Sequence, residues 1–434
     1  MYPTYPLDIV AVGVVAAVGS RSVVAAHQDD YTTASFTGIG MLLFAAVYWW
    51  LFKKEYVLEF DSGIEFRKTR YQKASQFPPP FPNGWFFICL SSELGNGQVR
   101  EVRILGKAMA LFRTRPTPTD DTHRQPTVHT KGKGRVGMLD AFCPHMGANL
   151  GVAGEIDKSS NCLKCCFHGW EFNHDGDCVK VHGTDTIPIN SSIKRYHVRE
   201  NNGSVYLWHD AEDRDPQYDP PLFPAIDDGT MYYGGMSSLQ VHAHIQELPE
   251  NGADVAHLNV LHKDFVSEAL GYFGLNHSWT ATWAPDEVLP YRTNITVNQH
   301  VCVKERFILP GLSVSVDIHQ HGPGLVSLDY STPLGRLVLF ENVTPEKVTT
   351  LQVRHVLFCA NTIPRPFAKF VIWATQTQFN RDVKIWETKR FVVKPLVSKA
   401  DGPLMAFRRW YSQFYTANST TFADALAQET MIDW

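Results

Sequence analysis

The stretch CPHMGANLGVAGEIDKSSNCLKCCFHGW, Cys143 to Trp170, decides the fold of the domain that contains it. It pairs Cys143 with His145 and, after nineteen intervening residues, Cys165 with His168. Two thiolates and two imidazoles on paired short loops suit either a structural zinc ion or a Rieske [2Fe–2S] cluster. Zinc sites usually space two cysteines or two histidines within each pair, whereas here each loop supplies one of each. This division favours a cluster in which one iron takes both thiolates and the other takes both imidazoles.

A second set of metal-binding side chains lies further along, in ELPENGADVAHLNVLH. His257 and His262 are five residues apart, and Asp254 precedes His257 by three. On a regular α-helix Asp254 and His257 share one face, whereas five residues turn about 500° and leave the two histidines roughly 140° apart. A π-bulge or another distortion of the helix would bring both rings to one metal. Two histidines and one carboxylate would form the facial triad of a mononuclear iron site with open positions for O₂.

The third ligand of such a triad is expected from a distant carboxylate. The segment 376–389, QTQFNRDVKIWETK, has an apolar helical stripe that includes Phe379 and Trp386, and Asp382 lies beside that stripe. Asp382 is therefore the candidate ligand. Glu387 is the alternative, although a solvated helix residue is the simpler interpretation of Glu387.

The two metal-binding segments resemble those of Rieske-type oxygenases. CPH…CCFHGW is similar to their C-x-H…C-P-x-H-G-W motif, with Cys166 in the place of the usual proline. The segment from Asp254 to His262 resembles their D-x-x-H-x-x-x-x-H iron motif, and the DVKIW segment beginning at Asp382 matches steroid-oxidising members. The resemblance implies two cofactors, a [2Fe–2S] cluster and an Fe²⁺ ion. It implies these ligands: Cys143, His145, Cys165 and His168 for the cluster, and His257, His262 and Asp382 for the iron.

The same resemblance gives Asp254 a catalytic role rather than a ligand role. In this family the matching acid bridges a cluster histidine of one subunit and an iron histidine of the next. The resemblance therefore implies a head-to-tail homotrimer in which Asp254 hydrogen-bonds the iron ligand His257 and the cluster ligand His168 across the subunit boundary. A plain supporting carboxylate that fixes the histidine tautomer is the alternative.

The rest of the sequence predicts an α+β protein with an N-terminal membrane helix. Tyr31 to Phe52 is a charge-free run of 22 residues, long enough to span a bilayer. Lys53 and Lys54 follow it, so the positive-inside rule places the catalytic part in the cytoplasm. We expect a single-pass protein of the endoplasmic reticulum membrane. The topology of residues 1–30 stays open.

Four regions are expected along the chain. Residues 1–54 form the anchor and 55–76 a connector. Residues 77–212 form an all-β Rieske domain, entered by the proline-rich arm FPPPFPNGW, and 213–434 form an α+β catalytic domain of helix-grip type with an antiparallel sheet. Within them we expect a hairpin over 97–114 turning at Gly106-Lys107, a strand over 204–209, and helices over 366–389 and 403–415.

Within the oxygenases, the chain most resembles the Neverland-type cholesterol 7-desaturases, through PNGWFFICLSSEL, FCPHMGANLGVAGEI, ENGADVAHLNVLH and DGPLMAFRRWYSQFY. The implied reaction converts cholesterol to 7-dehydrocholesterol with O₂ and two electrons from NAD(P)H. Hydroxylation of a steroid by the same machinery is one alternative, and a membrane-anchored Rieske electron carrier without catalytic iron is another. No G-x-G-x-x-G motif follows a strand, so a separate reductase is expected. With a net charge of −4 over 434 residues, no nucleic-acid partner is expected.

Overall fold

The computed structural model describes residues 57–61, 74–117, 127–264, 274–304, 307–398 and 401–432. All of them belong to one structural unit, Glu55–Trp434. The predicted membrane span Tyr31–Phe52 lies outside the described residues. Among the residues that are described, no helix is both long enough and apolar enough to cross a bilayer.

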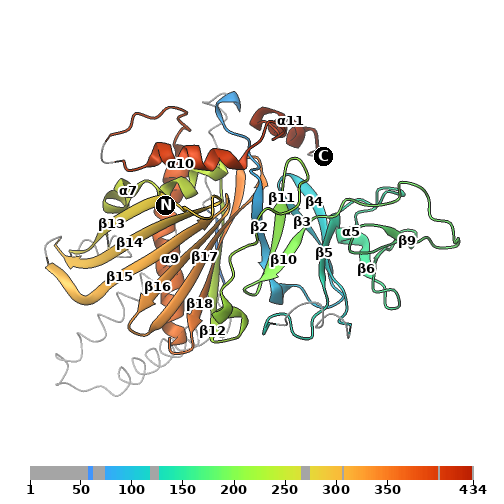
Figure 1. The fold of residues 1–434 in the computed structure, drawn as a ribbon, viewed down its shortest axis with the longest axis horizontal. Helices are drawn as coiled ribbons and strands as arrows, with labels where there is room; N and C mark the ends of the chain where they lie inside the picture. Colours follow the sequence, from blue (N-terminus) through green and yellow to red (C-terminus); the bar gives the residue numbers. More distant parts are fainter. Residues whose placement is uncertain are drawn as a thin grey trace, which may run out of the picture. The chain divides into compact units, whose positions relative to one another are not determined.

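An eight-stranded sheet forms the framework of the C-terminal part (Figure 1). Its order is β1-β12-β18-β17-β16-β15-β14-β13, so six strands that are consecutive in sequence form a meander. The strands are β1 (Val57–Asp61), β12 (Met231–Val241), β13 (Leu275–Pro285), β14 (Arg292–Val303), β15 (Phe307–His321), β16 (Leu325–Thr332), β17 (Gly335–Lys347) and β18 (Thr350–Ala360). All neighbours are antiparallel except β1, which pairs in parallel with β12. The expected connector 55–76 therefore contributes an edge strand.

Helix α9 (Arg365–Thr388) packs against this sheet, and Figure 1 shows it behind the strands. Its buried stripe contains Phe379, Val383 and Trp386, as the helical spacing predicts. Helix α10 (Leu404–Tyr411) continues into the 3₁₀ turn η6 (Ser412–Phe414), so both predicted C-terminal helices are confirmed. A further helix, α11 (Phe422–Ile432), was not predicted. The short helical segments are η2 (Ala74–Gln76), η3 (Ser91–Glu93), α5 (Leu150–Ala153), α6 (Pro224–Asp227), η4 (Ile245–Glu247), η5 (Pro249–Gly252) and α7 (Val255–Leu261).

Three small sheets make up the N-terminal part of the unit. Their orders are β10-β11-β2, β3-β4-β5 and β6-β7-β8-β9. The strands are β2 (Gly84–Leu90), β3 (Val99–Ile104), β4 (Lys107–Arg113), β5 (Val136–Asp140), β6 (Gly154–Ile156), β7 (Leu163–Cys165), β8 (Glu171–Phe172), β9 (Cys178–Lys180), β10 (Val198–Asn201) and β11 (Ser204–His209). The predicted hairpin is confirmed, but it turns at Leu105-Gly106, both with positive φ, one residue before the expected position.

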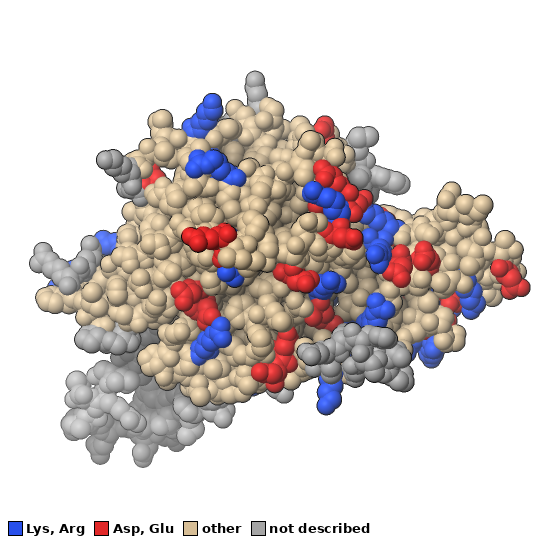
Figure 2. All heavy atoms as spheres, in the orientation of Figure 1, with Lys and Arg blue, Asp and Glu red and all other residues tan. Residues whose placement is uncertain are grey.

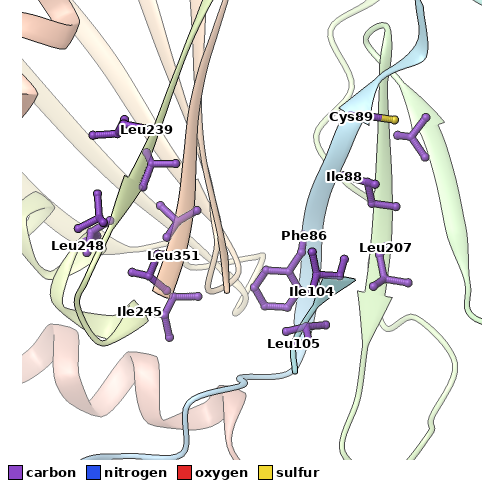
Figure 3. Close-up of a cluster of buried hydrophobic side chains, with 14 of the residues drawn as sticks. Phe86, Ile88, Cys89, Ile104, Leu105, Leu207, Leu239, Ile245, Leu248 and Leu351 are labelled. Atoms are coloured by element: carbon purple, nitrogen blue, oxygen red, sulfur yellow. The ribbon is translucent and has the colours of Figure 1, made fainter. Parts of the chain in front are cut away.

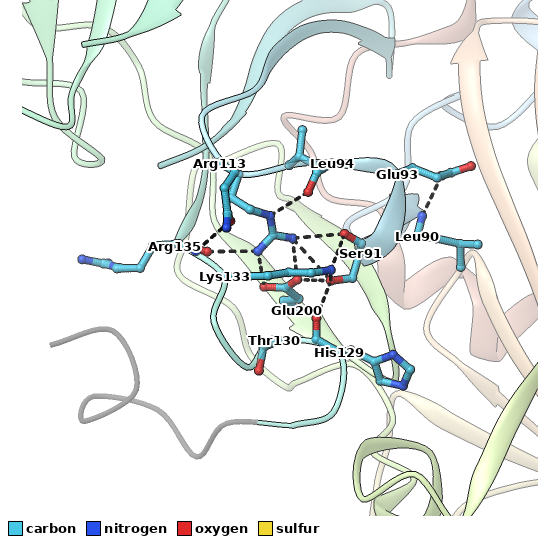
Figure 4. A network of polar contacts seen from close by, with 12 residues as sticks. Leu90, Ser91, Glu93, Leu94, Arg113, His129, Thr130, Lys133, Arg135 and Glu200 are labelled. Carbon is cyan, nitrogen blue, oxygen red and sulfur yellow. Dashed lines mark hydrogen bonds and ion pairs between the residues drawn. The ribbon is translucent and has the colours of Figure 1, made fainter. Parts of the chain in front are cut away.

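A buried ion pair joins two of the small sheets (Figure 4). Arg113 at the end of β4 is fully buried, and its Nη2 lies 2.6 Å from Oε1 of Glu200 on β10. The guanidinium also donates to the carbonyls of Leu94, at 2.9 Å, and Gly134, at 3.0 Å. Ser91 donates its hydroxyl to the same Glu200 carboxylate. Because each charge is met by several partners, the desolvation cost of burying them is offset.

One hydrophobic core runs from the small sheets into the large one (Figure 3). Phe86 and Leu207 from β2 and β11, with Leu105 from the β3–β4 turn, belong to the same buried cluster as Leu239 and Leu351 from β12 and β18. The small sheets and the large sheet therefore pack together through continuous buried side chains.

The charges on one face of the molecule are mixed (Figure 2). Lysine and arginine side chains lie interspersed with aspartate and glutamate over the described residues of that face. Such an arrangement differs from the basic stripe that tracks a nucleic-acid backbone.

Candidate functional site

The two loops that carry the predicted cluster ligands repeat one backbone pattern. In the first, the carbonyl of Cys143 accepts from the N–H of Gly147, and the N–H of Cys143 donates to Ala148. In the second, the carbonyl of Cys165 accepts from Gly169, and its N–H donates to Trp170. Both glycines have φ near +70°, a conformation that favours glycine. The sequence thus builds two matching turns, each presenting one cysteine and one histidine.

The thiols and the imidazoles of these loops differ in their surroundings. Cys143 and Cys165 are 3% and 2% exposed, whereas both histidines are exposed. The rings of His145 and His168 lie 4.5 Å apart, and His145 stacks on Trp170 at 4.8 Å. Burial raises the pKa of the Cys143 thiol to about 11. The N–H groups of His145 and Met146, directed at the sulfur, oppose this rise, and the neighbouring Cys165 sulfur adds to it. Two adjacent buried thiolates need a cationic partner, so the donor set fits an iron–sulfur cluster.

The second predicted site also assembles. The ligand atoms of His257, His262 and Asp382 all lie within 4.8 Å of one another. Nε2 of His262 is 3.1 Å from Oδ2 of Asp382, and Nε2 of His257 is 3.9 Å from Oδ1. His262 and Asp382 are 7% and 6% exposed. Two neutral imidazoles and one carboxylate on one side of a metal form the donor set that suits iron with open positions.

The end of α7 brings the two histidines together. The sequence predicts that a π-bulge or another distortion is needed, and in the structure the helix ends at Leu261. His262 follows with φ −102° and ψ 22°, outside the helical region. Its carbonyl accepts from Nε1 of Trp279 on β13, at 3.1 Å. The rings of His257 and His262 therefore meet with centroids 5.2 Å apart.

Two side chains that the sequence did not indicate hold the predicted ligands in place. Nδ2 of Asn251 donates to Oδ1 of Asp382 at 2.9 Å. Oε1 of Gln378 lies 3.1 Å from Nδ1 of His262, which leaves Nε2 of that ring to face Asp382. Such contacts fix the tautomer and the orientation of a ligand. An asparagine and a glutamine carry no spacing signal, so only the fold identifies them.

Asp254 lies at the N-cap of α7, next to the iron site. Its main-chain carbonyl accepts from Nδ1 of His257, which leaves Nε2 of that histidine for the metal. Its carboxylate makes no capping hydrogen bond to the helix. The contact with His257 that was expected from the carboxylate is thus made by the backbone, and a bridge from the carboxylate to His168 stays a prediction.

Glu387, the alternative ligand, lies away from the triad. It is 2% exposed, and its Oε1 accepts from the main-chain N–H of His242 at 3.0 Å. The interpretation of Glu387 as a solvated residue is therefore wrong, because its carboxylate ties α9 to the end of β12.

A cavity of about 160 Å³ opens beside the iron site. His257 and Asp382 lie at its wall, and most of its other lining side chains are apolar. They come from α9, the η4–η5 segment and the inner face of the meander, and include Leu248, Ile295, Val297, Ile318, Val326, Leu328, Phe379 and Trp386. A small number of polar groups in an apolar cavity is typical of a site for a largely apolar ligand.

Comparison with known proteins places both halves of the chain. Residues 84–196 match the Rieske [2Fe-2S] domain, and residues 207–415 match the 3-ketosteroid 9alpha-hydroxylase C-terminal domain. A dicamba monooxygenase crystal structure shares the fold, with a TM-score of 0.56, 18% identity and coverage of 77% of this chain and 97% of that one. The predicted Rieske domain and the α+β fold with antiparallel sheets are thereby confirmed.

Relatives with known activities are similar over most of the chain. Cholesterol 7-desaturase of Caenorhabditis elegans is 34% identical over 80% of this chain and 80% of its own length. Cholesterol 7-desaturase nvd of Bombyx mori is 35% identical over 86% and 78%. The oxygenase component of 3-ketosteroid-9-alpha-monooxygenase from Rhodococcus rhodochrous is 24% identical over 82% and 86%. The chain is therefore an oxidoreductase with a [2Fe–2S] cluster and a mononuclear iron, and it belongs to the cholesterol 7-desaturase family of Rieske oxygenases.

Proposed function

We propose that this protein is a cholesterol 7-desaturase. The observation that carries the proposal is the triad of His257, His262 and Asp382, with His257 and Asp382 at the wall of an apolar cavity, in a chain 32–35% identical to cholesterol 7-desaturases. One hydrogen leaves C7 of the sterol and one leaves C8. Each hydrogen carries one electron with it. These two electrons from the sterol and two electrons from NAD(P)H reduce O₂ to two molecules of water.

The residues of the two sites have distinct tasks in this reaction. Cys143, His145, Cys165 and His168 would hold the cluster, which supplies single electrons when bound. His257, His262 and Asp382 would hold the iron, which supplies O₂ activation when bound. The apolar lining excludes water and leaves the sterol skeleton as the group nearest the triad.

Electron transfer is proposed to run between subunits. Figure 1 places the strands around the cluster loops, β6 and β9, at the opposite end of the described unit from α7. His145 and His168 are exposed, and the neighbouring Met146 and Phe167 are 65% and 58% exposed. An apolar rim around exposed cluster ligands suits docking against another protein surface. A head-to-tail homotrimer would bring this tip to the iron site of the next chain, with Asp254 between them.

Membrane attachment and a separate reductase complete the proposal. The charge-free run Tyr31–Phe52 supports a membrane anchor, and Lys53-Lys54 supports a cytoplasmic catalytic part. We propose the endoplasmic reticulum membrane as the location, because a sterol partitions into the bilayer and anchoring raises its local concentration. The electrons would come from a separate NAD(P)H-dependent reductase.

The test is to express the full chain in cells supplied with cholesterol and to profile their sterols. We expect 7-dehydrocholesterol, recognised by the ultraviolet absorption of its conjugated diene, and none from an Asp382→Ala variant. A hydroxysteroid in its place would favour the steroid hydroxylase alternative, which the match to a ketosteroid hydroxylase domain supports. About three irons per purified chain are expected, whereas an electron carrier would contain two.

A further inference from the structure

One carboxylate in the cavity has no role in the iron site. Besides the triad residues and Asn251, the polar side chains that line the cavity are Gln320 on β15 and Glu341 on β17. The amide of Gln320 donates to the carbonyl of Gly322 at 3.0 Å. The Glu341 side chain is 20% exposed and lies among mostly apolar lining residues, where an ionised carboxylate gains from a hydrogen-bond donor.

The protein partner of Glu341 is a buried histidine. His355 on the adjacent strand β18 is 0% exposed, and its Nε2 lies 3.5 Å from Oε2 of Glu341 without making a hydrogen bond among the described residues. Oγ of Ser237 lies 3.1 Å from Nδ1 of the same ring. A hydroxyl donating to Nδ1 leaves the ring proton on Nε2, facing Glu341. One side of the carboxylate is thus met by a long contact, and the other side faces the cavity.

Glu341 lines the same cavity as His257 and Asp382 of the triad. The ring of His355 lies edge-on to Phe379 at 4.7 Å, so the pair of Glu341 and His355 packs against α9. Asp382 is three residues beyond Phe379, about 4.5 Å further along the helix axis. In cholesterol the C3 hydroxyl and C7 lie on adjacent fused rings. Because Glu341 and two triad residues line one cavity, a hydroxyl held at Glu341 would leave the second ring on the side of the iron site.

We propose that Glu341 accepts the hydrogen bond of the sterol 3β-hydroxyl and thereby positions C7 at the iron site. This inference rests on the proposed function. It makes Glu341 a specificity residue that distinguishes a 3-hydroxyl, which donates a hydrogen bond, from a 3-ketone, which only accepts one.

The test compares cholesterol with cholest-5-ene, which lacks the hydroxyl, in the full-length enzyme with its reductase. The wild type is expected to prefer cholesterol roughly ten- to hundredfold in kcat/KM, the range expected for a hydrogen bond to a charged group. Glu341→Leu should abolish that preference by lowering the rate with cholesterol alone. Glu341→Gln, which gains an N–H donor, should be inhibited by cholest-4-en-3-one at a several-fold lower concentration than the wild type.

Glu346→Gln is the matched control, because Glu346 lies on the same strand, outside this cavity, and accepts from Gln240 at 3.1 Å. It should keep the wild-type preference. Iron content and the electron paramagnetic resonance signal of the cluster must match in all variants. Equal loss of rate on both sterols, or an unchanged preference in Glu341→Leu, would overturn the inference. If the wild type converts no cholesterol, the proposed function fails, and the relative binding of the two sterols to wild type and Glu341→Leu still decides the role of Glu341.

Discussion

Asn251 holds the Asp382 carboxylate from one side and is held in turn by α9. Its Oδ1 accepts from Nε1 of Trp386 at 3.3 Å, while its Nδ2 donates to Asp382. Replacing it with alanine should free the carboxylate to rotate and reduce iron affinity or turnover about ten- to hundredfold. Iron per chain and product formation measure the effect, with the cluster spectrum unchanged.

Trp386→Phe is the control for this prediction. This variant keeps an aromatic ring in the core but removes the N–H that orients Asn251. Its loss of iron affinity and turnover should therefore be smaller than the loss in Asn251→Ala. If Asn251→Ala retained full iron content and full turnover, the carboxylate would be positioned by other contacts.

The buried pair of Arg113 and Glu200 gives a prediction about stability. Their side chains are 0% and 8% exposed, so Glu200→Gln leaves a guanidinium without its counter-charge in the interior. A loss of about 3–5 kcal/mol in unfolding free energy is expected. Denaturant titration followed by the visible absorbance of the cluster would measure it.

An exposed ion pair that includes Arg199, the neighbour of Glu200 on β10, supplies the comparison. Arg199 and Asp219 are 50% and 67% exposed and lie 2.9 Å apart, so Asp219→Asn should cost less than about 1 kcal/mol. If both variants lost the same unfolding free energy, burial of the Glu200 carboxylate would not explain its contribution to stability.

At the scale of single residues, the sequence indicated donors but not the groups that orient them. The short spacing of His257 and His262 marked two ligands of the triad, and the place of Asp382 beside an apolar helical stripe suggested the third. The structure brings the three together. The side chains that orient them come from elsewhere in the chain. Asn251 is 131 residues from Asp382, and Gln378 is 116 residues from His262. No local pattern encodes such pairs, because chain topology alone creates them.

At the scale of elements, the local sequence pattern predicted the helices and hairpins that form between residues close together in the chain. The 97–114 hairpin and helix α9 follow from alternation and from helical spacing, and both are observed. Strand β1 was not predicted, because its pairing with β12 joins distant segments of the chain. The sequence predicted only that α7 would be distorted, and not that it would end at Leu261. The hydrogen bond to the His262 carbonyl comes from Trp279 on β13, which is not adjacent to α7 in the local sequence pattern.

Helix α11 is a second unpredicted element, and its attachment can be tested. Phe422 at its start is 2% exposed and stacks on Phe77 of the proline-rich arm with ring centroids 4.5 Å apart. Phe422→Ala should cost about 3–5 kcal/mol of unfolding free energy, because it leaves a cavity between the arm and the helix. Gln428→Ala, on an exposed position of the same helix, should change stability by less than about 0.5 kcal/mol. A smaller loss of unfolding free energy in Phe422→Ala would mean that the proline-rich arm moves to fill the cavity.

At the scale of the whole molecule, β6 and β9 beside the cluster loops lie at the opposite end of the described unit from α7 of the iron site (Figure 1). The shared core around Phe86 and Leu351 joins the small sheets to the large sheet. In the proposed head-to-tail trimer the electron would cross to the iron site of a neighbouring chain, so assembly would bear directly on activity. An experiment that mixes variant subunits distinguishes electron transfer between chains from electron transfer within one chain.

Two inactive variants are predicted to restore each other. Cys143→Ser removes a predicted cluster ligand, and Asp382→Ala removes a predicted iron ligand, so each protein alone should produce no 7-dehydrocholesterol. When the two are co-expressed in equal amounts, a head-to-tail ring places an intact cluster beside an intact iron at about a quarter of the sites. Activity near a quarter of the wild-type value is therefore expected, measured per chain. Transfer within one chain would leave every mixed ring inactive, because no single chain then holds both metals.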